Sequence, residues 1–205
     1  MGRIQTFDTV AVVQAARNLF WDRGYDATSL AELEQATGLA RSSLYNAFGS
    51  KRGLFDAAVA DYLETVIRPR LRGLLTGAND ASGLLAYLDG LRLAVEARPT
   101  DSGDSPARGC LLVNCAAGLA GHDDPARAIV DGYRVELVAA LRHALLAAGA
   151  DSHTDSALAE ERARTLTSFT MSAMLLARVN PDESVALLAT ASGLVRGWIP
   201  EAVPA

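Results

Sequence analysis

Three short helical patterns, separated by glycines, occupy the beginning of the chain. Asp8 stands where a helix N-cap is expected, and the apolar residues after it keep helical spacing as far as Gly24. A second helix is predicted to start at Thr28 or Ser29, where Ser29 begins a capping-box pattern, and to end at Gly38. A third helix, short and polar, is expected over residues 41–47. This order of helix, glycine turn and short polar helix indicates a helix-turn-helix. The residues expected to be buried in the first two helices are Val10, Val13, Ala16, Leu19, Phe20, Leu30, Leu33 and Ala36.

The rest of the chain also has the pattern of helices. Ser50 is placed to cap a long helix that runs toward Ile67, and Pro69 is expected to bend or end it. No segment alternates like a strand, and alanine and leucine dominate over the β-branched residues. We therefore predict an all-α fold, with a helix-turn-helix domain at 1–52 and a larger helical domain at 53–205. The further helices are predicted over residues 81–98, 109–120, 125–148, 156–179 and 181–198.

The charge of the chain restricts how it can meet nucleic acid. Its net charge is −5 at pH 7, which argues against coating nucleic acid by bulk electrostatic attraction. Residues 1–52 carry six basic and five acidic side chains, so this part is only slightly basic. No apolar run approaches the roughly 18 residues of a membrane span, and no secretory signal is visible. We expect a soluble, cytoplasmic protein with no membrane partner.

The sequence lacks the residue patterns that enzymes and metal sites need. It contains no Ser/His/Asp order, no glycine-rich phosphate loop and no paired carboxylates. The three histidines, at positions 122, 143 and 153, have no partners at metal-ligand spacing. Cys110 and Cys115 are too far apart on one helix to form a disulfide. We therefore predict no enzyme, no catalytic residues, no metal and no cofactor.

The third predicted helix presents the side chains that a DNA-reading helix requires. Arg41 is suited to a guanine edge or a phosphate, and the two serines after it are short enough to allow close approach. Tyr45 and Lys51 suit phosphates, and the amides at the start of the second helix form a natural anion site. The candidate DNA-binding residues are Thr28, Ser29, Arg41, Ser42, Ser43, Tyr45, Asn46 and Lys51.

The segment from Gly24 to Phe55 resembles the amino-terminal domain of the TetR/AcrR family of repressors. The likeness rests on the turn glycine, the Leu44–Tyr45 pair, the run Phe48–Lys51 and the Leu-Phe pair that follows it. The resemblance implies a nine-helix homodimer in which the first three helices bind operator DNA. It also implies that the last two helices form a four-helix dimer bundle, and that the larger domain holds a pocket for a small effector.

The resemblance assigns roles to individual residues and shows one departure. It implies phosphate contacts for Thr28, Tyr45 and Lys51, and it directs Arg41, Ser42 and Ser43 toward bases. Many relatives carry an isoleucine-alanine pair where this chain has Glu34 and Gln35. Glu34 is therefore expected close to the DNA side, where a negative charge is unfavourable.

The two carboxy-terminal helices are predicted to form the dimer. Small residues there permit close helix approach, and leucines supply buried area. The residues expected in this interface are Ala173, Ala189, Ser192, Leu175, Leu187, Leu188 and Leu194.

The effector pocket is predicted from aromatic residues, methionines and a few polar groups in the larger domain. Methionines suit adaptable pockets, but each of these side chains taken alone is more typical of an ordinary core residue. A pocket somewhere among them is better supported than any single assignment. An amide in an apolar helix, such as Asn114, can also bond between helices instead of to a ligand. The candidate pocket residues are Tyr62, Tyr87, Leu91, Cys110, Asn114, Tyr133, Phe169, Met171 and Met174.

The run from Arg108 to Asn114 resembles a motif in a branch of the family that includes sensors of electrophiles and oxidants. There the cysteine that follows the glycine is reactive, which corresponds to Cys110. The nearby Arg108 and a helix amino terminus favour a thiolate, whereas the apolar flanking residues favour an inert buried thiol. Both interpretations stay open.

These observations favour a DNA-binding transcriptional regulator. We expect a repressor that leaves its operator when a small molecule binds, with electrophiles or oxidants as one class of signal. An interaction or small-molecule-binding protein of the same fold, without DNA binding, is the alternative. A thiol-dependent enzyme that uses Cys110 is a third hypothesis.

Overall fold

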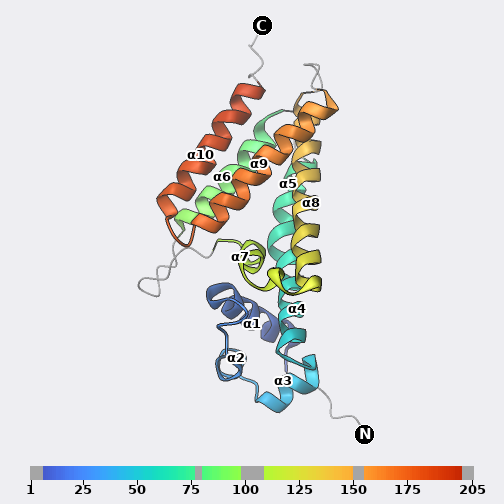
Figure 1. Cartoon of the computed structure of the whole chain (residues 1–205), viewed down its shortest axis with the longest axis vertical. Helices are drawn as coiled ribbons and strands as arrows, with labels where there is room; N and C mark the ends of the chain where they lie inside the picture. The colour runs from blue at the N-terminus through green and yellow to red at the C-terminus, as the bar shows by residue number, and fades with distance from the viewer. Residues whose placement is uncertain (1–6, 77–79, 98–108, 150–154, 200–205) are drawn as a thin grey trace. The chain divides into compact units, whose positions relative to one another are not determined.

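The computed structural model describes residues 7–76, 80–97, 109–149 and 155–199. Every regular element in these ranges is a helix, so the all-α prediction is confirmed (Figure 1). Ten α-helices are present in the described part of the chain, and two of them, α4 and α5, continue into each other through a π-helical turn. The described residues therefore form nine helical rods, the number that the family resemblance implies. None of the described helices has the length and apolar character required to cross a membrane.

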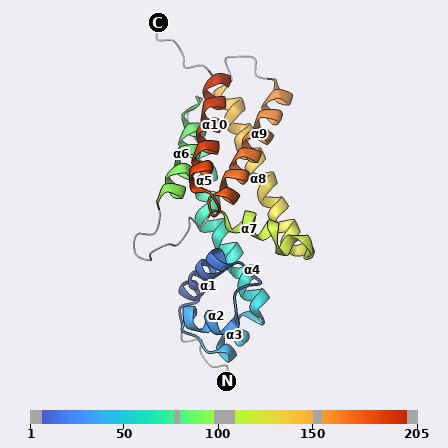
Figure 2. The same cartoon turned by 60° about the vertical axis from the view of Figure 1, so that its left-hand side comes forward.

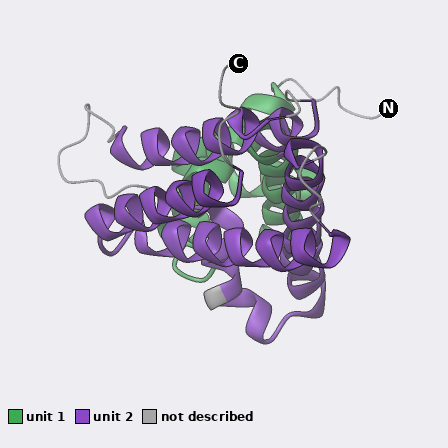
Figure 3. Cartoon of the chain, turned by 90° about the horizontal axis from the view of Figure 1, so that it is seen from above, with its two compact units in different colours: residues 1–67 green, residues 68–205 purple. Residues whose placement is uncertain are grey.

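The chain divides into two compact units, residues 1–67 and 68–205, which Figure 3 distinguishes by colour. The division falls after Ile67 and not after Arg52, because Leu54, Phe55 and Val59 are buried in the first unit. The elements of unit 1 are α1 (Thr9–Arg23), α2 (Leu30–Thr37), α3 (Arg41–Phe48), α4 (Lys51–Tyr62) and the π-helix η1 (Leu63–Ile67).

An aromatic cluster forms the core of unit 1. The rings of Phe20 on α1 and Phe55 on α4 meet edge to face, with centroids 5.1 Å apart. Tyr25 packs against Phe55 at 4.9 Å and against Phe20 at 6.1 Å. Trp21 and Tyr62 make a second edge-to-face pair at 4.8 Å. These contacts hold α1 against α4, and aromatic pairs of this kind stabilise beyond the area they bury.

The buried face of α1 differs from the predicted one. Val12, Ala16 and Phe20 are buried, whereas Val10 is 60% exposed. Because each helical residue turns by about 100°, Val10 lies on the side of α1 opposite to Val12. In α2 the burial of Leu33 is confirmed, but Ala36 is exposed. The predicted N-cap at Asp8 is confirmed, since its carboxylate accepts hydrogen bonds from the next helical amides.

Of the two effects predicted for Pro69, a bend or an end of the helix, the end does not occur. The chain passes from α4 through η1 directly into α5 (Arg68–Thr76), with Pro69 as the second residue of α5. A proline lacks an amide hydrogen and its ring crowds the carbonyl four residues earlier. In an α-helix the amide at position 69 would donate a hydrogen bond to the carbonyl four residues earlier. The wider π turn before Pro69 removes the need for this bond.

Unit 2 is a bundle of long helices. In Figures 1 and 2, α9 lies between α8 and α10, and α5 and α6 complete the ring, because α5 contacts α6 and α8 while α6 contacts α10. The short α7 packs against α8 and α9. The bounds are α6 (Ser82–Glu96), α7 (Leu111–Ala117), a 3₁₀ turn η2 (Leu119–Gly121), α8 (Asp124–Ala148), α9 (Ser156–Leu176) and α10 (Pro181–Trp198).

Two sequence-based expectations for unit 2 need correction. The helix predicted over 109–120 is shorter, because Gly118 interrupts it and η2 follows. Of the residues assigned to a dimer face, Ala173 and Leu188 are fully buried inside the unit, so they serve its own core. Leu175 and Ala189 are exposed.

Gly53 allows the first turn of α4 to pack against the end of α3. A Cβ atom at this position would lie 2.0 Å from the carbonyl oxygen of Phe48. We predict that Gly53→Ala destabilises the chain by about 1–3 kcal/mol in chemical unfolding, because the backbone has to shift. Gly132→Ala on α8 is the matched control, since its Cβ meets no atom within 4 Å. It is expected to gain up to about 1 kcal/mol from helix propensity. Equal effects of the two changes would contradict the proposed close packing.

Candidate functional site

The turn between α2 and α3 is fixed at both ends of α2. At the start, the hydroxyl of Ser29 accepts the amide of Glu32 at 3.3 Å, and the Glu32 carboxylate accepts the amide of Ser29 at 2.7 Å. The predicted capping box is thus confirmed. Arg23, at the end of α1, also pairs with Glu32. At the other end, Gly38 adopts φ 69°, a left-handed conformation that favours glycine. Its amide donates a hydrogen bond to the backbone carbonyl of Glu34.

The hydrogen bonds from Ser29 lower the pKa of Glu32, and the charge of Arg23 acts in the same direction. A carboxyl group whose pKa is lower in the folded than in the unfolded chain stabilises the fold while it is ionised. This contribution is present at neutral pH and is lost as the pH falls through the folded-state pKa. The start of α2 is therefore held in place at neutral pH.

Glu34, which lies on α2, caps the start of the next helix, α3. Ala40 precedes α3 and offers no side-chain cap. The carboxylate of Glu34 on α2 instead accepts the amide hydrogen of Arg41, the first residue of α3. A free amide at a helix start is satisfied best by an anionic oxygen. This contact gives a structural reason for an acidic residue at the position where the family resemblance shows a departure.

The predicted DNA-binding residues differ in accessibility. The side chains of Ser29, Arg41, Ser42, Tyr45 and Asn46 are exposed, and those of Ser43 and Lys51 are partly exposed. Thr28 is buried, and its hydroxyl donates to the carbonyl of Gly24 at 2.7 Å. Leu44, on the inner face of α3, is buried. The polar residues of α3 therefore face outward as a group.

Two cations on this face rest on aromatic rings. The guanidinium carbon of Arg41 lies 5.5 Å from the ring centre of Tyr45, and the ammonium of Lys51 lies 4.5 Å from that of Tyr25. Neither side chain forms an ion pair with a carboxylate among the described residues. The neighbouring Arg52, by contrast, pairs with Asp56 at 2.7 Å. Arg41 and Lys51 thus keep their charge available to an anion.

The predicted effector residues divide between the two units. Tyr62 belongs to unit 1, where it packs against Trp21. In unit 2, Tyr87, Leu91, Cys110, Tyr133 and Met174 are buried, and Asn114, Phe169 and Met171 are partly buried. Leu91 and Tyr133 pack as core residues. Cys110 is the residue just before α7, and Arg108 lies outside the described residues.

Polar groups from other elements of unit 2 act on the buried side chain of Tyr87. Burial raises the pKa of its hydroxyl far above the usual range, and the neighbouring Cys110 acts in the same direction. The charge of Arg70 and the hydroxyl of Thr170 oppose that rise. Tyr87 and Cys110 were both predicted, but Arg70 and Thr170 were not. Thr170 and Thr167 are the two threonines on the buried, mainly apolar face of α9, and a threonine on such a face is the signal that could have marked Thr170.

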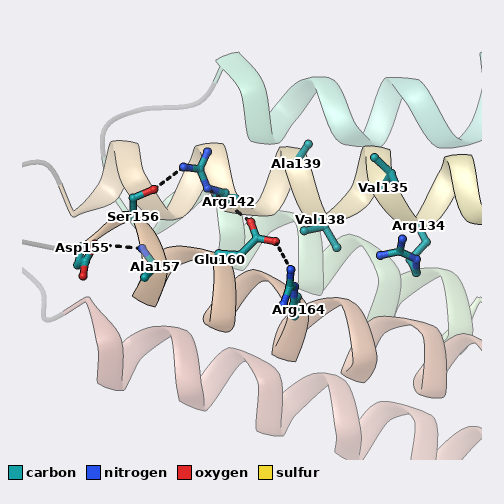
Figure 4. Close-up of a pocket in the computed structure, with 10 residues that line it drawn as sticks. All are labelled: Arg134, Val135, Val138, Ala139, Arg142, Asp155, Ser156, Ala157, Glu160 and Arg164. Carbon is teal, nitrogen blue, oxygen red and sulfur yellow. Dashed lines mark hydrogen bonds and ion pairs between the residues drawn. The ribbon is translucent and has the colours of Figure 1, made fainter.

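Two of the cavities in unit 2 differ in size and lining. The smaller, about 210 Å³, lies between α5 and α6 and includes Tyr87 among its lining residues. The larger, about 870 Å³, lies between α8 and α9 (Figure 4), and none of the predicted pocket residues lines it. In this cavity the carboxylate of Glu160 lies between two guanidinium groups, with nitrogen–oxygen distances of 3.5 Å to Arg142 and 3.0 Å to Arg164. Arg142 also donates to Ser156 at 2.6 Å. Arg142 and Arg164 are thus engaged with groups of the cavity's own walls, and the third lining cation, Arg134, pairs with Asp131 at 2.6 Å.

The Glu34 cap is testable by stability. We predict that Glu34→Ala lowers the free energy of unfolding by about 0.5–2 kcal/mol, the usual effect of removing a helix cap. Gln35→Ala, at the exposed neighbouring position of the same helix, is the control and is expected to change it by less than about 0.5 kcal/mol. Chemical unfolding followed by tryptophan fluorescence measures both. Equal losses in the two variants would show that the cap contributes nothing.

Comparison with known proteins places this site in a family. Residues 12–58 match the family described as bacterial regulatory proteins, tetR family. The Escherichia coli K12 repressor ComR is 36% identical over 113 residues, which are 55% of this chain and 51% of ComR. BdcR, a repressor of the same organism, is 33% identical over 132 residues, which are 64% of this chain and 62% of BdcR. The chain therefore spans less than two thirds of the length of these curated relatives.

A solved structure extends the likeness over both units. A cysteine variant of the TetR-family regulator CifR, in complex with a 26-bp operator DNA, is 32% identical with a TM-score of 0.68. The alignment covers 96% of this chain and 100% of CifR. TetR-family proteins are transcriptional regulators and not enzymes. From the matched helix-turn-helix and this full-length likeness we conclude that the chain belongs to the TetR family of transcriptional regulators.

Proposed function

We propose that this protein is an operator-binding repressor that acts as a homodimer and leaves DNA when a small molecule binds in unit 2. The observation that carries the proposal is the outer face of α3. It exposes Arg41, Ser42, Tyr45 and Asn46 while Leu44 is buried beneath them. The operator complex of CifR and the repressor names of ComR and BdcR support the same role.

In this proposal α3 enters the major groove. Arg41 offers two parallel donors to a guanine edge, and Asn46 offers a donor and an acceptor to adenine. Ser42 and Ser43 allow the helix to approach the bases closely. Tyr45 and Lys51 bind phosphates, as does the backbone at the start of α2. The Thr28 hydroxyl already donates to Gly24, so the contact assigned to Thr28 falls to its backbone amide.

The homodimer is proposed on the outer faces of α9 and α10. Ser168, Ser172 and Leu175 on α9 are exposed, and Val179, just after it, is 77% exposed. On α10 the exposed face contains Ala189 and other small residues, namely Ala186, Thr190, Gly193 and Gly197. Small side chains allow helices from two copies to pack closely around a two-fold axis. Two recognition helices would then lie in successive major grooves, about 34 Å apart or a small multiple of that spacing.

DNA binding is tested with the DNA that flanks the gene in its own genome. Lys51→Ala is expected to weaken binding and to reduce the slope of log K against log salt by about 0.9 for each phosphate that the side chain no longer neutralises. Tyr45→Ala should also weaken binding. Arg52→Ala is the matched control, since that cation is already paired with Asp56. If Lys51→Ala and Tyr45→Ala bind like the unmodified protein, the proposed docking is wrong. An absence of any salt-sensitive, sequence-selective binding would favour the alternative of a ligand-binding protein without DNA.

A thiol signal at Cys110 is a second candidate for the release step. Cys110 raises the pKa of Tyr87, so a change at its sulfur would alter the surroundings of the Tyr87 hydroxyl. It is only 2% exposed, and a reagent reaches it only when α7 moves locally. An alkylating electrophile would bond to the sulfur, and the thiol proton would leave to solvent.

The thiol candidate is tested with N-ethylmaleimide and, separately, hydrogen peroxide. Cys110→Ser is expected to keep DNA binding after treatment, whereas the unmodified protein loses it. Cys115→Ser is the control and should respond like the unmodified protein, although it is also buried. Circular dichroism confirms that each variant is folded. A Cys110→Ser variant that still responds would assign Cys110 a structural role.

A further inference from the structure

We infer that the pocket between α5 and α6 binds a small organic acid, with Arg70 pairing with its carboxylate and Tyr87 donating a hydrogen bond to it. Only the role of this acid as the effector that releases DNA rests on the proposed function. Binding itself does not require DNA.

Small residues create the space of this pocket. Its walls are Arg70, Gly73, Gly83, Ala86, Tyr87 and Gly90, with α5 supplying the first two. Cβ atoms at Gly73 and Gly90 would meet no other atom within 4 Å, so larger side chains here would project into open space. The volume of about 210 Å³ is smaller than the roughly 300–1,000 Å³ of sites for drug-sized ligands. The pocket therefore suits a molecule of a few heavy atoms with one compact apolar part.

Arg70 gives the pocket an available positive charge. It is half-buried and forms no ion pair or hydrogen bond with any residue in the described part of the chain. Arg68, two residues earlier on the same helix, pairs with Glu136 of α8 at 3.4 Å. Arg92 on α6 is likewise held by Asp89 and Glu96. A guanidinium group that is partly removed from water and lacks a carboxylate partner is a ready site for one.

Tyr87 supplies the second contact. It is 9% exposed and is one of the residues that line the pocket. Arg70 and Tyr87 both line this pocket, and the charge of Arg70 lowers the pKa of the Tyr87 hydroxyl against the effect of burial. A tyrosine hydroxyl is protonated at physiological pH, and burial raises the pKa of Tyr87 further from that range. The hydroxyl can therefore donate to an oxygen whose charge Arg70 neutralises.

The geometry favours a carboxylate over other anions. A planar guanidinium binds a carboxylate through two parallel hydrogen bonds. Glycine and alanine walls offer apolar surface to an organic group but few donors for the additional oxygens of inorganic phosphate. The larger cavity of Figure 4 is a poorer candidate, because Glu160 already occupies Arg142 and Arg164.

The experiment measures ligand binding to the full chain without DNA. Butyrate and benzoate are the carboxylate probes, benzamide is the uncharged analogue of benzoate, and inorganic phosphate is the non-organic anion. At saturating concentration, at least one carboxylate is expected to raise Tm by about 2–4 °C, with little effect of benzamide or phosphate. Calorimetry should show that Arg70→Gln weakens carboxylate binding at least about tenfold. Gly90→Leu should abolish binding by filling the pocket.

Arg72→Gln is the matched control, because Arg72 is exposed on the same helix and does not line the pocket. It should bind the carboxylates normally. The inference is overturned if no carboxylate binds, if benzamide or phosphate binds as well, or if Arg70→Gln binds as tightly as the unmodified chain. A separate measurement of operator release distinguishes the two proposals. Carboxylate binding that depends on Arg70 but leaves DNA bound supports this pocket and contradicts its role as the release site.

Discussion

The packing of Phe20 against Phe55 fixes the part of the molecule proposed to meet DNA. Helices α2 and α3 contain eight residues each, and helices of this length are not stable alone in water. They keep their conformation because α1 and α4 are held together by this buried aromatic contact. Tyr25 joins the same cluster and carries the ammonium of Lys51 above its ring. The core of unit 1 thus also sets the position of a proposed phosphate contact.

A common physical distinction separates structural cations from those proposed to bind a ligand. Arg17 pairs with Asp61 at 2.6 Å and joins α1 to α4, and Arg68 pairs with Glu136 and joins α5 to α8. Arg41, Lys51 and Arg70 have no carboxylate partner in the described ranges. Paired cations at partly buried positions mainly position helices, whereas an unpaired cation beside an aromatic ring or hydroxyl keeps its electrostatic potential for an incoming anion.

The sequence alone predicted what depends on local patterns. The caps at Asp8, Ser29 and Ser50 follow from hydrogen bonds within a few residues, and all three are present. Features that depend on residues distant in the chain escaped prediction. The pocket of Arg70 exists only because α6 brings Tyr87 beside α5. In the sequence, Arg70 looks like one of several solvated arginines around Pro69.

The carboxylate of Glu34 at the start of α3 has a consequence for how such a regulator would search a genome. Every stretch of DNA presents phosphates, but only a cognate site presents the right base edges to Arg41 and Asn46. A fixed negative charge beside the recognition helix α3 weakens binding to any stretch of DNA, because it repels the phosphates. The same charge also weakens binding to a cognate site, but at that site the contacts to base edges compensate for the loss. With a net charge of −5, the chain would stay only briefly on unrelated sequences, so that selectivity is gained at the expense of overall affinity.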